Sequence, residues 1–285
     1  MKTPSPRRVL VSLAVLTLGL GGAIGAIGLA ESSARAGDGK GKKPKQTILL
    51  DGIREHVNFN DGDSFRVLDG PRKGQKARLI GYNTLESYGP VHFWGSANGW
   101  DLYHVNERDQ ELAKSEEWEC ETSGQADGYG RILVHCPELR KRMIQEGLAH
   151  VYAYKDEPDP DLVKLMHQAQ DERRGMWKYG VPTHIVTSIH SIDEGKEGDS
   201  EEIGSGGSKK AYNRVADTKT GKTFAVDHEL VYKPCDAFCH GGSCLIYVPF
   251  KMRFGEDRPA CMRGPGGEKN RLVPDPSLGE PMRKD

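Results

Sequence analysis

The chain has no surplus of charge of either sign. Its 40 Lys and Arg residues nearly balance its 41 Asp and Glu residues, which leaves a formal net charge of −1 over 285 residues and a pI of about 6.8. This balance provides no global basic field, so any site for nucleic acid must be local. Hydrophobic residues are scarce as well, at 36%, with a mean hydropathy of −0.63, which excludes a protein built wholly of membrane spans.

The sequence also lacks any internal repeat and any sustained helical pattern. Its 35 glycines and 16 prolines argue against a coiled coil or a long-helix protein. The length allows one large domain or two small ones.

One long apolar run is present, from residue 9 to residue 30. Basic residues precede it, and the small residues Ala34 and Ala36 follow at the spacing that a signal peptidase reads. We expect residues 1–36 to be a cleaved signal peptide and the mature chain to be exported. The alternative is an uncleaved N-terminal membrane anchor, since the run is close to the length of a membrane span. No cysteine lies near it, which excludes lipid attachment there.

An even number of cysteines in an exported chain predicts disulfides. The six are Cys120, Cys136, Cys235, Cys239, Cys244 and Cys261. The first two flank a predicted hairpin and are expected to form a cross-strand bond. The last four favour two further disulfides. Zinc is the alternative because His240 lies among them, although zinc sites usually have closer C-x2-C pairs.

Composition divides the chain into segments. Residues 194–210 are acidic and rich in Gly and Ser, as in a flexible linker, and the C-terminal tail is rich in Gly, Pro and charge. The predicted order is signal (1–36), linker (37–48), a dense domain (49–180), connector and flexible linker (181–210), cysteine-rich segment (211–262) and disordered tail (263–285).

Periodicity within the dense domain predicts strands first and helices afterwards. The expected strands are residues 56–60, 64–68, 75–82, 117–121 and 131–136, with two more in the cysteine-rich segment at 224–231 and 244–249. The expected helices are residues 107–114, 139–147 and a third that starts at Asp159 or Asp161 and runs to residue 176, with Asp161 as the candidate N-cap and Gly175 at its end. The fold class is therefore α+β, a small barrel with packed helices and a small cysteine-rich β segment.

Chemically useful residues gather around the first three predicted strands. Hard cations such as Ca²⁺ prefer several oxygen ligands. Such oxygens are supplied by Asp63, the Asn83 side chain and the Thr84 carbonyl. Glu86 could act as a general base on water, while Arg78 and Arg131 could neutralise a phosphate. These are the components that hydrolysis of a phosphodiester requires.

The spacing of these residues resembles the staphylococcal (micrococcal) nuclease family. The matching motifs, in chain order, are residues 60–67 (NDGDSFRV), 78–86 (RLIGYNTLE), 88–90 (YGP), 127–131 (DGYGR), 145–149 (QEGLA), 152–154 (YAY) and 175–177 (GMW). Seven elements in order make a chance match improbable. The resemblance covers about residues 55–180 and does not extend to residues 181–285.

The resemblance implies an OB-type five-stranded barrel with packed helices and Ca²⁺-dependent cleavage of DNA and RNA with little sequence preference. The implied catalytic residues are Arg78, Glu86 and Arg131. The implied metal ligands are Asp63, Asn83 and Thr84, with Asp61 supporting the site from just outside it. The implied substrate contacts are Tyr129, Tyr152 and Tyr154, whose rings suit sequence-tolerant stacking. We expect a monomer with no stable membrane partner once the signal is cleaved.

Three positions depart from the family pattern. Asn83 replaces an aspartate, which predicts weaker metal affinity and leaves another divalent ion possible. Leu85 replaces a proline and is expected to loosen the backbone of its loop. Gly128 replaces a frequent lysine. The alternative function is therefore a catalytically impaired OB-type module that binds nucleic acid or protein.

Residues 91–104 (VHFWGSANGWDLYH) form an aromatic segment where the family runs directly into a helix. We favour a packing cover over the barrel. The alternatives are an aromatic lip that stacks on substrate and a metal site at His92 and His104.

Overall fold

The structure is a computed structural model that describes residues 46–86, 91–97, 99–194, 211–253 and 258–262. All of them belong to the unit Lys43–Asp285. The predicted signal peptide, the 88–90 motif, nearly all of the flexible linker and the C-terminal tail lie outside the described residues. Within the described part, no helix has the length and apolar character needed to cross a membrane.

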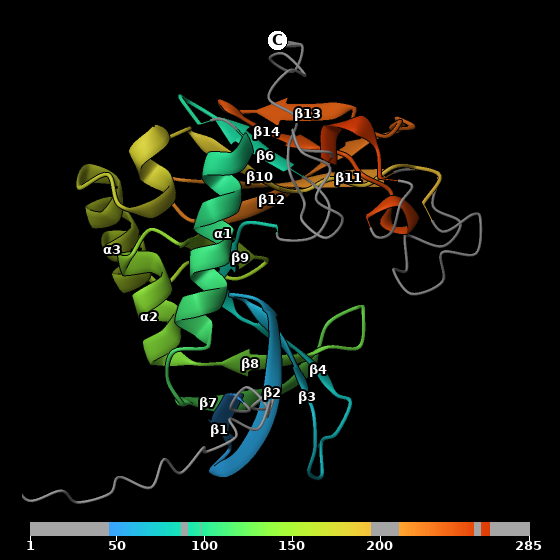
Figure 1. The fold of residues 1–285 in the computed structure, drawn as a ribbon. Coiled ribbons are helices and arrows are strands. Elements are labelled where there is room, and N and C mark those ends of the chain that lie inside the picture. Colours follow the sequence, from blue (N-terminus) through green and yellow to red (C-terminus); the bar gives the residue numbers. More distant parts are fainter. Residues whose placement is uncertain (1–45, 87–90, 98, 195–210, 254–257, 263–285) are drawn as a thin grey trace, which may run out of the picture. The chain divides into compact units, whose positions relative to one another are not determined.

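Strands from the first half of the described chain form a closed barrel (Figure 1). In barrel order the strands are β1 (Gln46–Leu50), β2 (Ile53–Asp61), β3 (Ser64–Val67), β4 (Lys76–Leu79), β8 (Ile132–His135) and β7 (Trp118–Ala126). The predicted barrel is confirmed. It closes through six strands rather than five, because β1 pairs antiparallel with β2 and parallel with β7.

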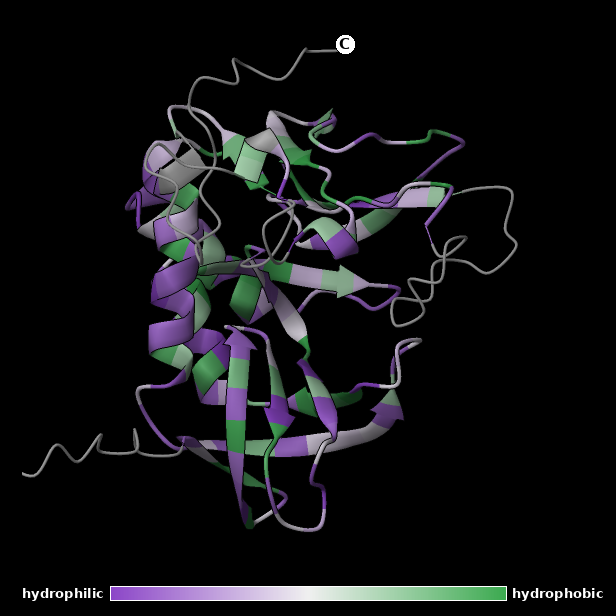
Figure 2. Cartoon of the chain, turned by 45° about the vertical axis from the view of Figure 1, so that its right-hand side comes forward, coloured by the Kyte–Doolittle hydropathy of each residue, from purple (hydrophilic) through white to green (hydrophobic). Residues whose placement is uncertain are grey.

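Alternating side chains build the barrel interior. Val57 and Phe59 of β2 lie opposite Val67 and Phe65 of β3, and the two phenylalanine rings are 5.4 Å apart between centroids. All four are almost fully buried, while the residues between them face outward. Hydropathy accordingly alternates along these strands (Figure 2).

The strand predicted at residues 75–82 is two strands in the structure. β4 ends at Leu79, and β5 (Gly81–Thr84) leaves the barrel to join a second sheet. Gly81 makes the change of direction with a φ of 90°, where a Cβ would also meet the Arg140 side chain at 2.7 Å. The prediction of one strand was wrong, because a single glycine inside an apolar pattern does not reveal that the chain leaves one sheet for another.

The second sheet joins segments that are distant in sequence. Its order is β10 (His184–Ser188), β11 (Ala211–Asp217), β12 (Lys222–His228), β9 (Ala149–Tyr154) and β5. β12 pairs parallel with β9, and β9 pairs antiparallel with β5. Strands from beyond residue 180 therefore extend the sheet that carries Asn83 and Thr84.

The aromatic segment begins a third sheet, ordered β13 (Ala237–His240), β14 (Ser243–Ile246) and β6 (Val91–Trp94). Val91, His92 and Trp94 are buried, and β6 pairs antiparallel with β14. His104 pairs instead with Glu107 on its own helix, at 2.9 Å. The segment is therefore packed, with β6 in the third sheet and Trp94 in the main buried cluster, and its two histidines have separate partners; a cover over the barrel stays a prediction.

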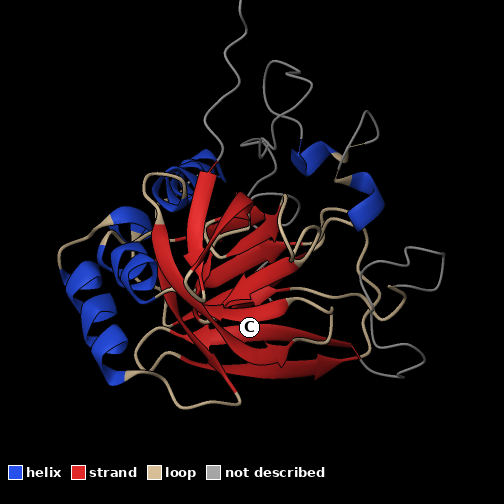
Figure 3. Cartoon of the chain, turned by 90° about the horizontal axis from the view of Figure 1, so that it is seen from below, coloured by secondary structure: helices blue, strands red, loops and turns tan. Residues whose placement is uncertain are grey.

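Three α-helices lie along one side of the strands (Figures 1 and 3). They are α1 (Gly99–Ala113), α2 (Pro137–Gln145) and α3 (Pro160–Asp171), and short 3-10 helices occur at Gly175–Tyr179, Phe250–Met252 and Ala260–Met262. The N-cap of α3 is Asp159 rather than Asp161, and its side chain accepts a hydrogen bond from the Asp161 N–H at 3.0 Å. α3 also stops at Asp171, because Arg173 adopts a φ of 55° before Gly175 is reached.

The six cysteines form three disulfides. Cys120 bonds to Cys136 between β7 and the start of α2, as predicted. In the C-terminal segment Cys235 bonds to Cys261 and Cys239 to Cys244. Disulfides rather than zinc therefore account for all four C-terminal cysteines.

Candidate active site

The turn between β2 and β3 holds two carboxylates, of which Asp63 is buried and Asp61 half-buried. Asp61 accepts hydrogen bonds from the Ser64 hydroxyl at 2.6 Å and from the Asp63 N–H at 3.3 Å. Gly62 between them has no room for a side chain, since a Cβ would lie 2.7 Å from Thr84 Cγ2 and 2.9 Å from Asp109 Cβ. This close approach brings the turn, β5 and α1 together at one point.

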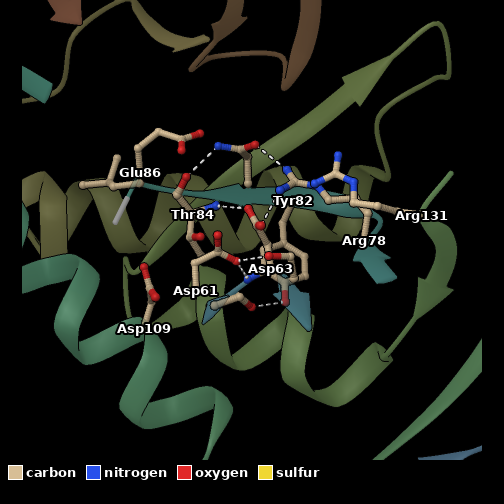
Figure 4. A network of polar contacts seen from close by, with 12 residues as sticks. Asp61, Asp63, Arg78, Tyr82, Thr84, Glu86, Asp109 and Arg131 are labelled. Carbon is tan, nitrogen blue, oxygen red and sulfur yellow. Dashed lines mark hydrogen bonds and ion pairs between the residues drawn. The ribbon is translucent and has the colours of Figure 1, made fainter. Parts of the chain in front are cut away.

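Arg78 links the turn to β5 (Figure 4). Its guanidinium donates to one oxygen of Asp63 and to the side-chain oxygen of Asn83. The other Asp63 oxygen accepts from the Thr84 N–H at 2.8 Å, and the Asn83 amide donates to the Thr84 carbonyl at 2.6 Å. The structure thus brings together Asp61, Asp63, Arg78, Asn83 and Thr84, as the sequence predicted.

Asp109 is a member of the cluster that sequence reasoning missed. It projects from α1 and is fully buried, and its Oδ1 has no hydrogen-bond partner among the described residues (Figure 4). Asn106 donates to its other oxygen at 3.3 Å. One signal was available, because Asp109 falls at helical spacing with the buried Leu102, Val105 and Ala113.

The carboxylates of the cluster outnumber its cations, which raises the pKa values of two of them. Burial and the neighbouring Asp63 charge raise the pKa of Asp61 to about 8. Burial, followed by the charges of Asp61 and Asp63, raises the pKa of Asp109 well above its usual value. Arg78 is the cation that contacts this group directly, and the Asp63 charge raises its pKa despite burial. With only one guanidinium beside them, Asp61 and Asp109 therefore retain their protons near neutral pH, and a bound cation would favour their ionised forms.

The donor atoms of this cluster fit a hard metal ion. Asp63 offers carboxylate oxygens, Asn83 an amide oxygen and Thr84 a carbonyl oxygen. Asp109 adds a buried oxygen that has no hydrogen-bond partner among the described residues. In the described part of the chain, no set of three or more His, Cys, Asp or Glu side chains is arranged to hold a metal by itself. A metal here would therefore depend on the Asn83 amide and the Thr84 carbonyl as well as on carboxylates.

Glu86 follows β5 and is positioned through its backbone. Its N–H donates to His92 Nε2 at 3.2 Å. Burial, followed by the nearby His150, lowers the pKa of His92 to about 3, so this ring is neutral and can accept the bond. The preceding Leu85 is buried, and its carbonyl accepts from Asn106 at 2.7 Å. These contacts hold the loop that the replacement of proline was expected to loosen.

Arg131 is presented by the turn between β7 and β8. Asp127 accepts hydrogen bonds from the backbone N–H groups of Tyr129 and Arg131, both at 2.9 Å, and from Arg131 Nε at 2.7 Å. Burial opposes the charge on Asp127, but the bonds from Arg131 lower its pKa. Because β4 and β8 are parallel with Arg78 opposite Leu133, Arg131 projects to the same face as Arg78. Figure 4 shows both guanidiniums on the same flank of the carboxylate cluster.

Two of the three predicted substrate tyrosines, Tyr129 and Tyr152, lie near these arginines, and Tyr154 lies near Arg214 instead. The Arg131 guanidinium lies 5.5 Å from the ring centroid of Tyr129. Burial raises the pKa of Tyr152, whereas the charges of Arg214 and Arg78 oppose this rise. Tyr152 on β9 therefore lies in the field of a site arginine and of an arginine from β11. Arg214 was not predicted as a site residue, since nothing near it in sequence resembles the family.

Buried carboxylates beside two arginines and a glutamate, on a small barrel, define a protein suited to phosphodiester hydrolysis. Comparisons with known proteins agree with this class. Residues 76–179 match the family model described as "Staphylococcal nuclease homologue". An Escherichia coli protein named "Uncharacterized endonuclease" is 28% identical over 131 residues, which cover 44% of this chain and 77% of that relative. The predicted resemblance is confirmed for residues 76–179, while β1 to β3, with the turn that holds Asp61 and Asp63, and β10 to β14 lie outside the family match.

Proposed function

We propose that this chain is an exported, metal-dependent nuclease that hydrolyses phosphodiester bonds in DNA and RNA with little sequence preference. The observation that carries the proposal is the contact of buried Asp63 with Arg78, with half-buried Asp61 and buried Asp109 beside it, where Arg78 and Asp109 belong to the segment that matches a nuclease family model. A metal ion would replace the protons on these carboxyl groups and favour their ionised forms, while the arginines on the same flank attract the substrate phosphates.

In this proposal each catalytic residue has one task. Arg78 and Arg131 bind the scissile phosphate and offset the charge that grows on its oxygens during attack. Glu86 orients the attacking water and accepts its proton. Tyr129, Tyr152 and Tyr154 contact the substrate beyond the scissile phosphate, where stacking tolerates any base.

Asp63, Asn83 and the Thr84 carbonyl are the residues that would hold Ca²⁺, with Asp61 supporting them. The bound ion would supply positive charge to the scissile phosphate. Asn83 carries no charge, so we expect weaker affinity than an aspartate would give, and Mn²⁺ or Mg²⁺ are alternatives.

Export is part of the proposal. All six cysteines of the sequence are paired, and structural disulfides are typical of oxidising compartments. The N-terminal residue of the mature chain tests this point, since signal cleavage predicts a start after residue 36.

The function is tested by cleavage of single-stranded DNA with Ca²⁺ or with EDTA, using wild type and Glu86→Gln. We expect EDTA to abolish cleavage, and Glu86→Gln to lower kcat by about a hundredfold or more, because a general base of this kind typically contributes that much. Glu138→Gln is the matched control, since Glu138 is exposed on α2 and pairs with Lys141. A folded wild type that binds DNA but cuts nothing with Ca²⁺, Mn²⁺ or Mg²⁺ would instead support the OB-type binding module.

A further inference from the structure

An arginine from outside the nuclease-family segment reaches the tyrosines of the candidate active site. Arg214 lies on β11, which is joined to β9 through β12. Its guanidinium lies 5.4 Å from the ring centroid of Tyr154 and 5.0 Å from that of Tyr212. The C-terminal sheet therefore places a cation against a tyrosine that the family resemblance assigns to substrate.

The hydrogen-bond partners of Arg214 are neutral phenols. Its Nη2 donates to the Tyr212 hydroxyl at 2.9 Å, and a further bond joins its side chain to that of Tyr129. Its Nε is buried and has no partner among the described residues. The protein thus holds the guanidinium in place while leaving part of its hydrogen-bonding capacity unused.

Unlike the two catalytic arginines, Arg214 has no ion-pair partner among the described residues. Arg78 pairs with Asp63, and Arg131 pairs with Asp127. Among the described residues, no carboxylate lies within ion-pair distance of Arg214. A half-buried guanidinium that is held by aromatic rings and faces no acid is a ready partner for a phosphate.

Arg214 is also connected to the scissile-phosphate arginines through shared tyrosines. Tyr129 lies against Arg131 and also bonds to Arg214. Tyr152 lies in the fields of both Arg78 and Arg214. The three arginines and these tyrosines therefore form one continuous surface rather than two separate features.

We propose that Arg214 is a substrate-binding residue of the nuclease, and that it holds, together with the hydroxyls of Tyr129 and Tyr154, a phosphate adjacent to the scissile one. This inference rests on the proposed function and deepens it, because it assigns a substrate contact to the C-terminal sheet. The ligand is the phosphodiester or terminal monophosphate of a single-stranded polynucleotide. A guanidinium binds such a group through two parallel N–H donors, which Lys cannot reproduce.

The test compares dinucleotides that differ by one phosphate. The substrates are dithymidine monophosphate and the same dinucleotide with an added 5′ or 3′ terminal phosphate. For wild type we expect one added phosphate to raise kcat/KM by about tenfold, the effect of one charge-assisted contact. Arg214→Gln should abolish that gain, so that the three dinucleotides are cleaved with the same kcat/KM, while Arg214→Lys should keep only part of the gain. Arg142→Gln, which removes an exposed arginine paired with Glu116, should behave as wild type.

A purely structural role for Arg214 predicts a different pattern. Arg214→Gln would then lower the unfolding midpoint and reduce cleavage of all three dinucleotides by the same factor, which would overturn the proposal. Equal gains from the added phosphate in wild type and Arg214→Gln would overturn it as well.

A binding measurement separates this proposal from the nuclease itself. With EDTA present, a fluorescent oligothymidylate should bind wild type with a steeper salt dependence than it binds Arg214→Gln, by about 0.7 in the slope of log K against log salt, for the loss of one phosphate contact. That difference in a wild type that never cuts would support the Arg214 site and overturn the proposed catalysis. Identical slopes in a wild type that cuts would overturn the Arg214 site alone.

Discussion

At the residue scale, two uncharged histidines are buried behind the end of β5. His92 and His150 are 4% and 1% exposed. Burial is the main cause that lowers their pKa values, to about 3 for His92 and about 4 for His150. His92 accepts the Glu86 N–H, and His150 lies opposite Asn83 in the pairing of β5 with β9. Both neutral rings therefore support residues of the candidate site.

Their burial makes folding sensitive to acid. A histidine whose folded pKa lies below its unfolded value of about 6.5 binds its proton only after unfolding, so stability falls as pH drops below 6.5. Between pH 7.5 and about pH 5 we expect each histidine to remove about 2 kcal/mol from the free energy of unfolding. Urea unfolding of wild type and His92→Gln measures this. The Gln side chain still offers an oxygen to Glu86 but does not titrate, so the loss in the variant should be about 2 kcal/mol smaller. Equal losses in the two proteins would contradict the prediction.

At the element scale, the hairpin of β7 and β8 carries Arg131 and is closed at its base by Cys120–Cys136. Both cysteines are 2% exposed. The bond spans 16 residues, a loop for which closure entropy corresponds to about 3 kcal/mol. The hairpin is therefore fixed at its base by a covalent bond and at its turn by Asp127.

Removal of this disulfide should affect both stability and catalysis. We expect Cys120→Ala with Cys136→Ala to lose about 3 kcal/mol of unfolding free energy and to lower kcat, because the turn that presents Arg131 becomes less ordered. The matched control is Cys239→Ala with Cys244→Ala, which opens a bond spanning 5 residues in the β13–β14 hairpin. Urea unfolding and single-stranded DNA cleavage measure the two effects. Similar losses of activity in both double variants would argue against a specific role for the β7–β8 bond.

The same elements show how far the sequence predicts the fold. Period-2 alternation and the Asp61–Asp63 turn predicted β2 and β3, and apolar helical spacing predicted α2, because the contacts behind these patterns are local. The change from β4 to β5 and the pairing of β6 with β14 depend on distant segments, and local patterns do not encode them.

The candidate site divides in the same way. The sequence predicted five site residues because they lie in two short motifs, residues 60–67 and 78–86. They are Asp63, Arg78, Asn83, Thr84 and Glu86. Asp109 and Arg214 were missed because tertiary packing alone brings α1 and β11 to the site. From sequence alone, a charged residue at either position is interpreted as solvent-exposed, and only the structure shows its burial.

At the scale of the whole described chain, the C-terminal strands pack with the segment that matches the family model. Ile185 of β10 belongs to the same buried cluster as Val151 of β9. A Cβ at Gly221, next to β12, would lie 2.5 Å from a Val151 methyl group, so the two segments are in close contact. The sheet that carries Asn83 and Thr84 is therefore completed from beyond residue 180.

A chain ending at residue 180 should consequently be less stable than one ending at residue 262. Loss of Ile185 burial alone is expected to cost about 2 kcal/mol, and β9 would lose its pairing with β12, which leaves an open sheet edge. Residues 46–180 and 46–262 can be compared by urea unfolding and by binding of a hydrophobic dye. The shorter chain should unfold at lower urea, bind more dye, and lack the phosphate-dependent gain assigned to Arg214. Equal unfolding midpoints would mean that residues 181–262 are an independent domain, in which case the shared sheet contributes little to the stability of residues 46–180.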